Sequence, residues 1–193
     1  MNFATMADSP ADTDLELLAR WRGGDARAGD ALSRRHTAVL RQFFRTKARP
    51  EDLDDLVQQV WLALGETRSG VQSTLRAYLF GIARHVLFAH LRARYRAGAV
   101  DPISSSITAL DPSLSQVVGE RVAAERMMLV LQSLPVDTQI LLELRYFSSM
   151  STAELAAMYD VPPGTIKSRL FTARKLLEAG MDNRAQPGSS TKG

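Results

Sequence analysis

The chain has 193 residues, of which 45% are hydrophobic, so it is long enough to bury one or two compact cores. It contains no cysteine, which excludes disulfides and thiolate metal sites. The net charge is only +3, but acidic and basic residues are segregated along the chain, and this matters more for its partners than the total does.

The N-terminal residues, MNFATMADSPADTD, lack the basic-then-apolar order of a signal peptide. No apolar run approaches the roughly 18 residues that a membrane span needs. We therefore expect a cytoplasmic protein with no membrane contact of its own.

Apolar residues recur at the helical period in almost every segment, and the alternation typical of strands is missing, so we expect an all-α fold. The first eleven residues, 1–11, have the composition of a flexible N-terminus. In the N-terminal half, helices are expected over 14–22, 26–47, 51–64 and 74–96.

The composition changes after this half. Residues 98–117 contain two prolines, several serines and little charge, which is typical of a linker between domains. Helices are expected again over about 116–134, 138–146 and within 151–177, followed by a polar, flexible tail over 182–193. The pattern thus predicts two small helical domains joined by a flexible linker.

The helix expected over 51–64, EDLDDLVQQVWLAL, begins with acidic residues near the positive end of the helix dipole, which stabilises the helix whatever it binds. Its apolar stripe leaves an outward polar surface that is most often simply solvated. An exposed tryptophan would favour a protein interface, where aromatic residues are enriched. This surface comprises Asp55, Gln58, Gln59 and Trp61.

The helix expected over 74–96 carries five arginines and no acidic residue, with tyrosine and phenylalanine interleaved. Such a pattern suits single-stranded nucleic acid, because phosphates pair with arginine and bases stack on aromatic rings. The alternative is a core helix that is buried on two sides and whose arginines reach out to solvent.

The segment STAELAAMYDVPPGTIKSRLFTARKLL, residues 151–177, predicts two helices around a tight turn. Ser151 and Glu154 have the spacing of a capping box. Asp160 stands at the bend, where the residue must tolerate a left-handed backbone. Pro163 prevents the first helix from continuing, and Thr165 is expected to open the second. The segment is typical of a helix-turn-helix, and the alternative is an amphipathic hairpin with a solvated basic face.

The second of these helices carries residue types that suit duplex DNA. Lysine and arginine bind phosphates and guanine edges, serine and threonine form short hydrogen bonds, and phenylalanine can contact a thymine methyl. The residues that face outward or flank the apolar stripe are Thr165, Lys167, Ser168, Arg169, Phe171, Thr172, Arg174 and Lys175.

Signatures of catalysis are missing from the sequence. His85 and His90 are five residues apart, which puts them on different sides of a helix, whereas zinc ligands on one face are four apart. There is no glycine-rich phosphate loop and no nucleophile elbow. We therefore expect no enzymatic activity, no cofactor and no metal site.

Taken together, these segments resemble the extracytoplasmic-function (ECF) group of the sigma-70 family, across roughly residues 15–181. DLDDLVQQVWLAL is similar to the family's polymerase-binding helix, LRAYLFGIARHVLFAHLR to its promoter-melting helix, and LPVDTQILLELRYFSSMSTAELAAMYDVPPGTIKSRLFTARKLL to its C-terminal promoter-binding domain. Their order across a linker carries more weight than one helix-turn-helix. The resemblance implies a sigma-2-like domain over 12–97 and a sigma-4-like domain over 118–181.

The resemblance also implies an alternative sigma factor that delivers core RNA polymerase to promoters, and it assigns residue roles. The clamp helices of the largest polymerase subunit would be bound by Asp55, Leu56, Gln58, Gln59 and Trp61. The duplex minus-35 element would be contacted by Arg145, Thr165, Lys167, Ser168, Arg169, Phe171, Thr172 and Arg174. The single-stranded minus-10 element would lie near Arg76, Tyr78, Arg84, His85 and Arg92.

Four residues depart from the family pattern, so the resemblance does not predict which promoter sequence is recognised. His85 stands where many relatives have Asn, Ala89 and His90 replace a common Asp-Tyr pair, and Thr172 replaces a frequent Arg. The resemblance further implies control by an anti-sigma factor that covers both domains.

Two other functions compete with this interpretation. A DNA-binding regulator that acts alone would use the helix-turn-helix but has no need of the N-terminal half. A module that only sequesters another protein through Trp61 and the acidic helix has no need of Lys167 or Ser168.

Overall fold

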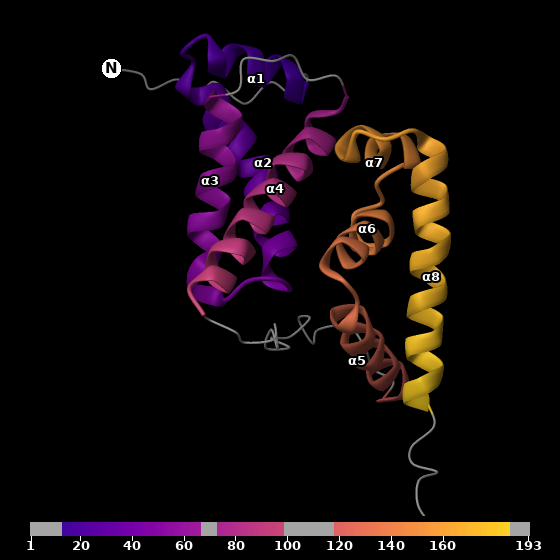
Figure 1. Ribbon diagram of the computed structural model, residues 1–193. Coiled ribbons are helices and arrows are strands. Elements are labelled where there is room, and N and C mark those ends of the chain that lie inside the picture. The colour runs from indigo at the N-terminus through magenta and orange to yellow at the C-terminus, as the bar shows by residue number, and fades with distance from the viewer. Residues whose placement is uncertain (1–12, 67–72, 99–117, 186–193) are drawn as a thin grey trace, which may run out of the picture.

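The computed structural model describes residues 13–66, 73–98 and 118–185, and over these residues it consists of helices without strands. This confirms the predicted all-α class. Figure 1 shows two groups of helices side by side, one from the N-terminal half and one from the C-terminal half. Residues 99–117, which form nearly all of the predicted linker, lie outside the described residues, as do residues 1–12.

The N-terminal group comprises α1 (Asp14–Arg22), α2 (Ala26–Arg45), a short 3-10 helix η1 (Pro50–Asp52), α3 (Leu53–Glu66) and α4 (Leu75–Arg96). Side chains satisfy the free backbone groups where these helices begin. Thr13 and Glu16 form a capping box on α1, Asp25 caps α2, and Thr74 caps α4.

The C-terminal group comprises α5 (Val118–Ser133), α6 (Val136–Tyr146), α7 (Thr152–Tyr159) and α8 (Pro163–Ala185). Two expectations are wrong here. Helix α8 begins at Pro163 and not at Thr165, because the fixed φ of proline suits the first helical position, where no amide donor is needed. The helix also continues to Ala185, so Asp182 belongs to α8, while residues 186–193 lie outside the description.

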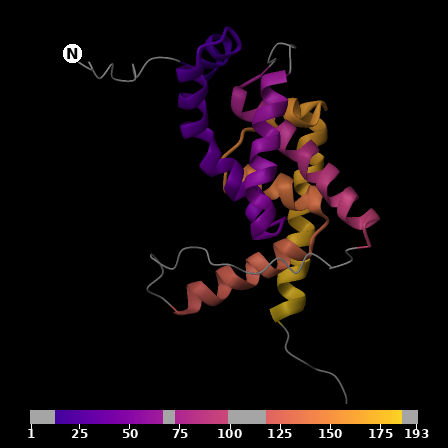
Figure 2. The same cartoon turned by 90° about the vertical axis from the view of Figure 1, so that its left-hand side faces the viewer.

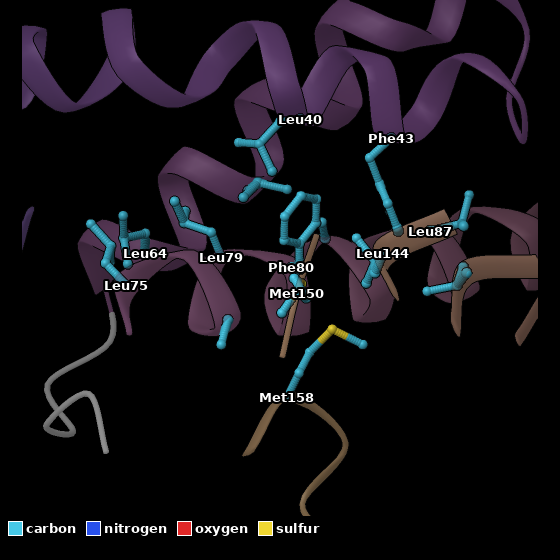
Figure 3. Packing of buried hydrophobic residues seen from close by; sticks show 14 of the residues in the cluster. Leu40, Phe43, Leu64, Leu75, Leu79, Phe80, Leu87, Leu144, Met150 and Met158 are labelled. Atoms are coloured by element: carbon cyan, nitrogen blue, oxygen red, sulfur yellow. The ribbon is translucent and has the colours of Figure 1, made fainter. Parts of the chain in front are cut away.

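The largest hydrophobic core runs through both groups. In the N-terminal group it contains fully buried side chains such as Leu40, Phe44 and Phe80, each of which stabilises the fold by about 1.5–3 kcal/mol. It continues into Leu144 of α6 and Met158 of α7. Figure 3 shows these C-terminal side chains close to α4, and Figure 2 shows the two groups overlapping when viewed from the side. The two helical groups are therefore packed against each other.

Candidate nucleic-acid and polymerase interfaces

Helices α7 and α8 form the predicted helix-turn-helix. The Ser151 amide donates to Glu154 Oε2 at 2.9 Å, and the Glu154 amide donates to Ser151 Oγ at 3.1 Å, which completes the predicted capping box. Asp160 has φ 52° and ψ 51°, so it adopts the left-handed conformation expected at the bend. The hydrogen bond from the Ser151 amide lowers the pKa of the Glu154 carboxyl, and burial opposes it.

The face of α8 that was predicted to read the minus-35 element is open to solvent. Ile166, Leu170 and Ala173 are buried and hold the helix in place. Thr165 is half-buried in the first turn. The exposed members of the predicted set are Lys167, Ser168, Arg169, Phe171, Thr172 and Arg174.

Arg145 stabilises the loop that leads into the helix-turn-helix. Its Nη1 donates to the carbonyl oxygen of Met150 at 2.8 Å, in the loop between α6 and α7, and the residue is half-buried. Tyr159 at the end of α7 donates from its hydroxyl to the carbonyl oxygen of Asp137 at 3.3 Å, and burial raises the pKa of its phenol. The Arg169 guanidinium lies 5.7 Å from the Tyr159 ring, within cation–π range.

Helix α3 exposes the three polar residues of the predicted outward surface. Asp55, Gln58 and Gln59 are exposed, and Gln59 Nε2 donates to Asp55 Oδ2 at 2.7 Å. Leu56, to which the resemblance gives a polymerase-binding role, belongs to the apolar stripe of the helix: its side chain is 0% exposed and lies in the core.

Trp61 lies at the edge of the α3 surface. It is half-buried, and its ring meets that of Trp21 edge-on, with centroids 6.3 Å apart. Its Nε1 is buried with no hydrogen-bond partner among the described residues. Trp61 therefore anchors α3 on α1 and shows only part of its ring to solvent.

The arginine-rich helix α4 is buried on two sides. Leu79, Phe80 and Leu87 are in the core, which was the structural alternative foreseen for this helix. Of the residues predicted to lie near the minus-10 strand, His85 and Arg92 are exposed and Tyr78 is half-buried.

Arg76 and Arg84, the other two of that set, do not reach out to solvent but bind the C-terminal group. Arg76 donates to the carbonyl oxygen of Ser148, and Arg84 Nε donates to Asp137 Oδ1 at 2.7 Å. The Arg84 guanidinium also lies 4.8 Å from the ring of Tyr159. The structure therefore places two of the five predicted minus-10 residues at the boundary between the helical groups.

None of the described helices is both long and apolar enough to cross a membrane. Within residues 13–66, 73–98 and 118–185, no group of three or more His, Asp or Glu side chains is placed to hold a metal ion.

Comparison with known proteins identifies the class. The family model for sigma-70 region 2 matches residues 31–97, and the model for sigma-70 region 4 matches residues 124–177. The chain therefore belongs to the sigma-70 family of RNA polymerase sigma factors. Within this family it is of the ECF type.

Two curated relatives span nearly the whole chain. The ECF RNA polymerase sigma-E factor of Escherichia coli K12 is 29% identical over 91% of this chain and 95% of its own length. The RNA polymerase sigma-H factor of Pseudomonas aeruginosa is 28% identical over 88% of this chain and 94% of its own length.

Two solved structures share the fold. CnrH in complex with the cytosolic domain of CnrY superposes with a TM-score of 0.64, at 24% identity, over 89% of this chain and 99% of that chain. The sigma factor RpoE in complex with the anti-sigma factor NepR from Bartonella quintana superposes with a TM-score of 0.59, at 24% identity, over 76% and 91%.

Proposed function

We propose that this sigma factor binds core RNA polymerase through the polar surface of α3 and carries it to two-element promoters, which it contacts with α8 and α4. The observation that supports this most is the pairing of two separate surfaces in one chain. A helix-turn-helix presents Lys167 and Ser168, and a second surface on α3 presents Gln58 and Gln59 without any basic residue among them.

The exposed face of α8 suits duplex recognition in the major groove. Lys167 and Ser168 lie in its N-terminal half, which is the part of a recognition helix that contacts base edges. Arg169 and Arg174 are exposed and long enough to reach phosphates, which fix the register of the helix on the duplex. Arg145 acts through the Met150 carbonyl that it holds, so we assign it to support of the turn.

The α3 surface suits a protein partner. Asp55 and Gln59 already hold each other in one geometry at 2.7 Å, which reduces the side-chain entropy lost on binding. Leu56 and Trp61 act from behind this surface, the first in the core and the second through its contact with Trp21. A positive charge introduced at Gln59 would pair with Asp55 and so change the charge and shape of this surface.

His85 and Arg92 on α4 are exposed and available to a melted minus-10 strand, for which Tyr78 offers a half-buried ring. Arg76 and Arg84 would join them after the C-terminal group has moved away.

We also assign to this chain a cytoplasmic location, a role as an initiation factor and not as an enzyme, and control by an anti-sigma protein. The last assignment is supported by the two structural neighbours, which were solved with the cytosolic domain of CnrY and with the anti-sigma factor NepR. The predicted linker, residues 98–117, is long enough for such a protein to hold the two domains together or to release them.

Co-fractionation with purified core polymerase, followed by promoter-fragment binding with and without the enzyme, tests this function. We expect a stable complex with core polymerase and specific promoter binding only in that complex. If the chain binds duplex DNA tightly and specifically by itself and forms no complex with core polymerase, it is instead a DNA-binding regulator that acts alone.

A further inference from the structure

The boundary between the two helical groups is closely packed. Helix α4 contacts α7, and a Cβ added to Gly81 of α4 would lie 3.7 Å from the carbonyl oxygen of Met158 of α7. A side chain at this position would therefore be in van der Waals contact with α7. Figure 3 shows Met158, Met150 and Leu144 near Phe80, so apolar side chains from both groups share one core.

A buried ion pair joins the groups beside this core. Lys47, just after α2, is 1% exposed, and its ammonium forms an ion pair with the carboxylate of Glu143 on α6. The ammonium also donates to the carbonyl oxygen of Phe43 at 2.8 Å and to Thr46 Oγ1 at 2.9 Å. Glu143 in turn accepts a hydrogen bond from Gln139 Nε2 at 2.8 Å.

Each partner of this pair depends on the other. Burial lowers the pKa of Lys47, and Glu143 opposes that change. A buried ammonium that loses its carboxylate partner is strongly unfavourable, whereas both groups are readily hydrated if the domains separate. Removal of one charge therefore favours separation of the two domains.

Three further polar contacts join residues at the start and in the middle of α4 to the C-terminal group. Arg84 binds Asp137 of α6 at 2.7 Å, and Arg76 donates to the carbonyl oxygen of Ser148. The Thr74 hydroxyl donates to Glu154 Oε1 of α7 at 3.0 Å. The guanidinium groups of Arg76 and Arg84 thus donate to the protein the kind of hydrogen bond that they would otherwise donate to nucleic-acid phosphates.

We propose that Lys47–Glu143 and Arg84–Asp137 form an interdomain latch, which holds the unbound chain closed and withholds Arg76 and Arg84 from DNA. The closed chain is then inactive by itself, without an inhibitor, and polymerase and promoter must bind the open form. In the closed state the C-terminal group holds these two arginines through Asp137 and the Ser148 carbonyl, so closure of the latch competes with binding of DNA at α4. The role of Arg76 and Arg84 in DNA binding rests on the proposed function, but the closed state does not.

Distance measurement between spin labels tests the latch directly. Because the chain has no cysteine, Ala93→Cys on α4 and Ala179→Cys on α8, both at exposed positions, give one labelled pair in the full chain. We expect one narrow distance distribution for the otherwise unchanged protein. Asp137→Asn combined with Glu143→Gln should shift it to longer, broader distances while the helical circular dichroism stays unchanged.

The matched control removes the same two charges from exposed positions of the same domain, by Glu125→Gln and Glu178→Gln, and should leave the distance unchanged. A broad distribution in the unchanged protein would overturn the proposal. So would a distribution in the Asp137→Asn, Glu143→Gln variant that matches that of the unchanged protein.

A second variant remains informative even if loss of the buried carboxylate unfolds the domain. Gly81→Cys with Met158→Cys places two thiols across the boundary, and oxidised glutathione converts them to a disulfide, taking up the two electrons and two protons. We expect efficient cross-linking and a loss of promoter-dependent transcription by about tenfold or more, restored by dithiothreitol. Absence of cross-linking, or full activity of the cross-linked chain, would contradict the latch. A reduced variant that never transcribes would count against the proposed function, while the distances still decide the latch.

Discussion

Arg84 on α4 donates from Nε to Oδ1 of Asp137 on α6 at 2.7 Å, across 53 residues of sequence. The same guanidinium lies 5.0 Å from the Phe88 ring and 4.8 Å from the Tyr159 ring. Its charge is thus satisfied by one carboxylate and two aromatic faces. Since Arg84 is also a predicted minus-10 residue, its contacts with Asp137 and Tyr159 compete with binding of a DNA phosphate.

Lys167→Ala should weaken promoter recognition by about 1–3 kcal/mol, or roughly 5–150-fold, because a base-edge contact would be lost from an exposed recognition helix. Binding of the polymerase complex to wild-type and minus-35-substituted promoters measures this effect. Polymerase binding should be unchanged. Lys175→Ala removes the same charge from the same helix and should weaken binding uniformly across sequences. Equal loss of sequence discrimination in both variants would refute the assigned reading role.

Gln59→Arg should abolish co-fractionation with core polymerase, because it replaces a neutral amide in the proposed interface by a longer cationic side chain that would pair with Asp55. Gln42→Arg makes the same change at an exposed glutamine of α2 and should leave the complex intact. Circular dichroism would show that both variants are folded. If Gln59→Arg binds polymerase as well as Gln42→Arg does, the α3 surface is not the polymerase interface.

Asp160→Gly should preserve or raise the free energy of unfolding by up to about 1 kcal/mol, because glycine adopts the observed left-handed backbone without a steric cost. Asp160→Val should lower it by about 1–2 kcal/mol, since a branched side chain disfavours a φ of 52°. Urea unfolding of the two variants measures the difference. Equal stability of the glycine and valine variants would be inconsistent with this backbone conformation.

Ser151→Ala should destabilise the chain by about 1 kcal/mol, because the side chain caps the Glu154 amide at 3.1 Å. Ser133→Ala, at the exposed end of α5, is the control and should change stability less.

The Ser151 amide holds the pKa of Glu154 below its usual 4.5, so this carboxylate stabilises the fold above that pH. The contribution is lost as the pH falls through the lowered pKa, and unfolding measured from pH 6 downward should show it.

Local sequence signals predicted the all-α fold and the geometry of the helix-turn-helix, for identifiable reasons. The capping box, the left-handed Asp160 and the apolar stripe of α8 are encoded within a few residues of each other. Residues that lie close together in the sequence determine the local backbone geometry in each of these cases. The bounds of α8 were less accurate, because proline both ends one helix and suits the first position of the next.

What the sequence did not reveal is long-range. Lys47 and Glu143 are 96 residues apart, and neither belongs to a periodic pattern or a motif. Trp61 was expected to face outward, and its contact with Trp21 of α1 depends on how two helices pack.

Run-off transcription shows whether the chain directs core polymerase to promoters. Purified chain and core enzyme are combined with a library of genomic promoter fragments, and the transcripts are sequenced. We expect defined start sites that share two upstream elements, and we expect these transcripts to be lost with Lys167→Ala or Gln59→Arg. Transcription no different from that of core enzyme alone, with a folded chain present, would contradict it.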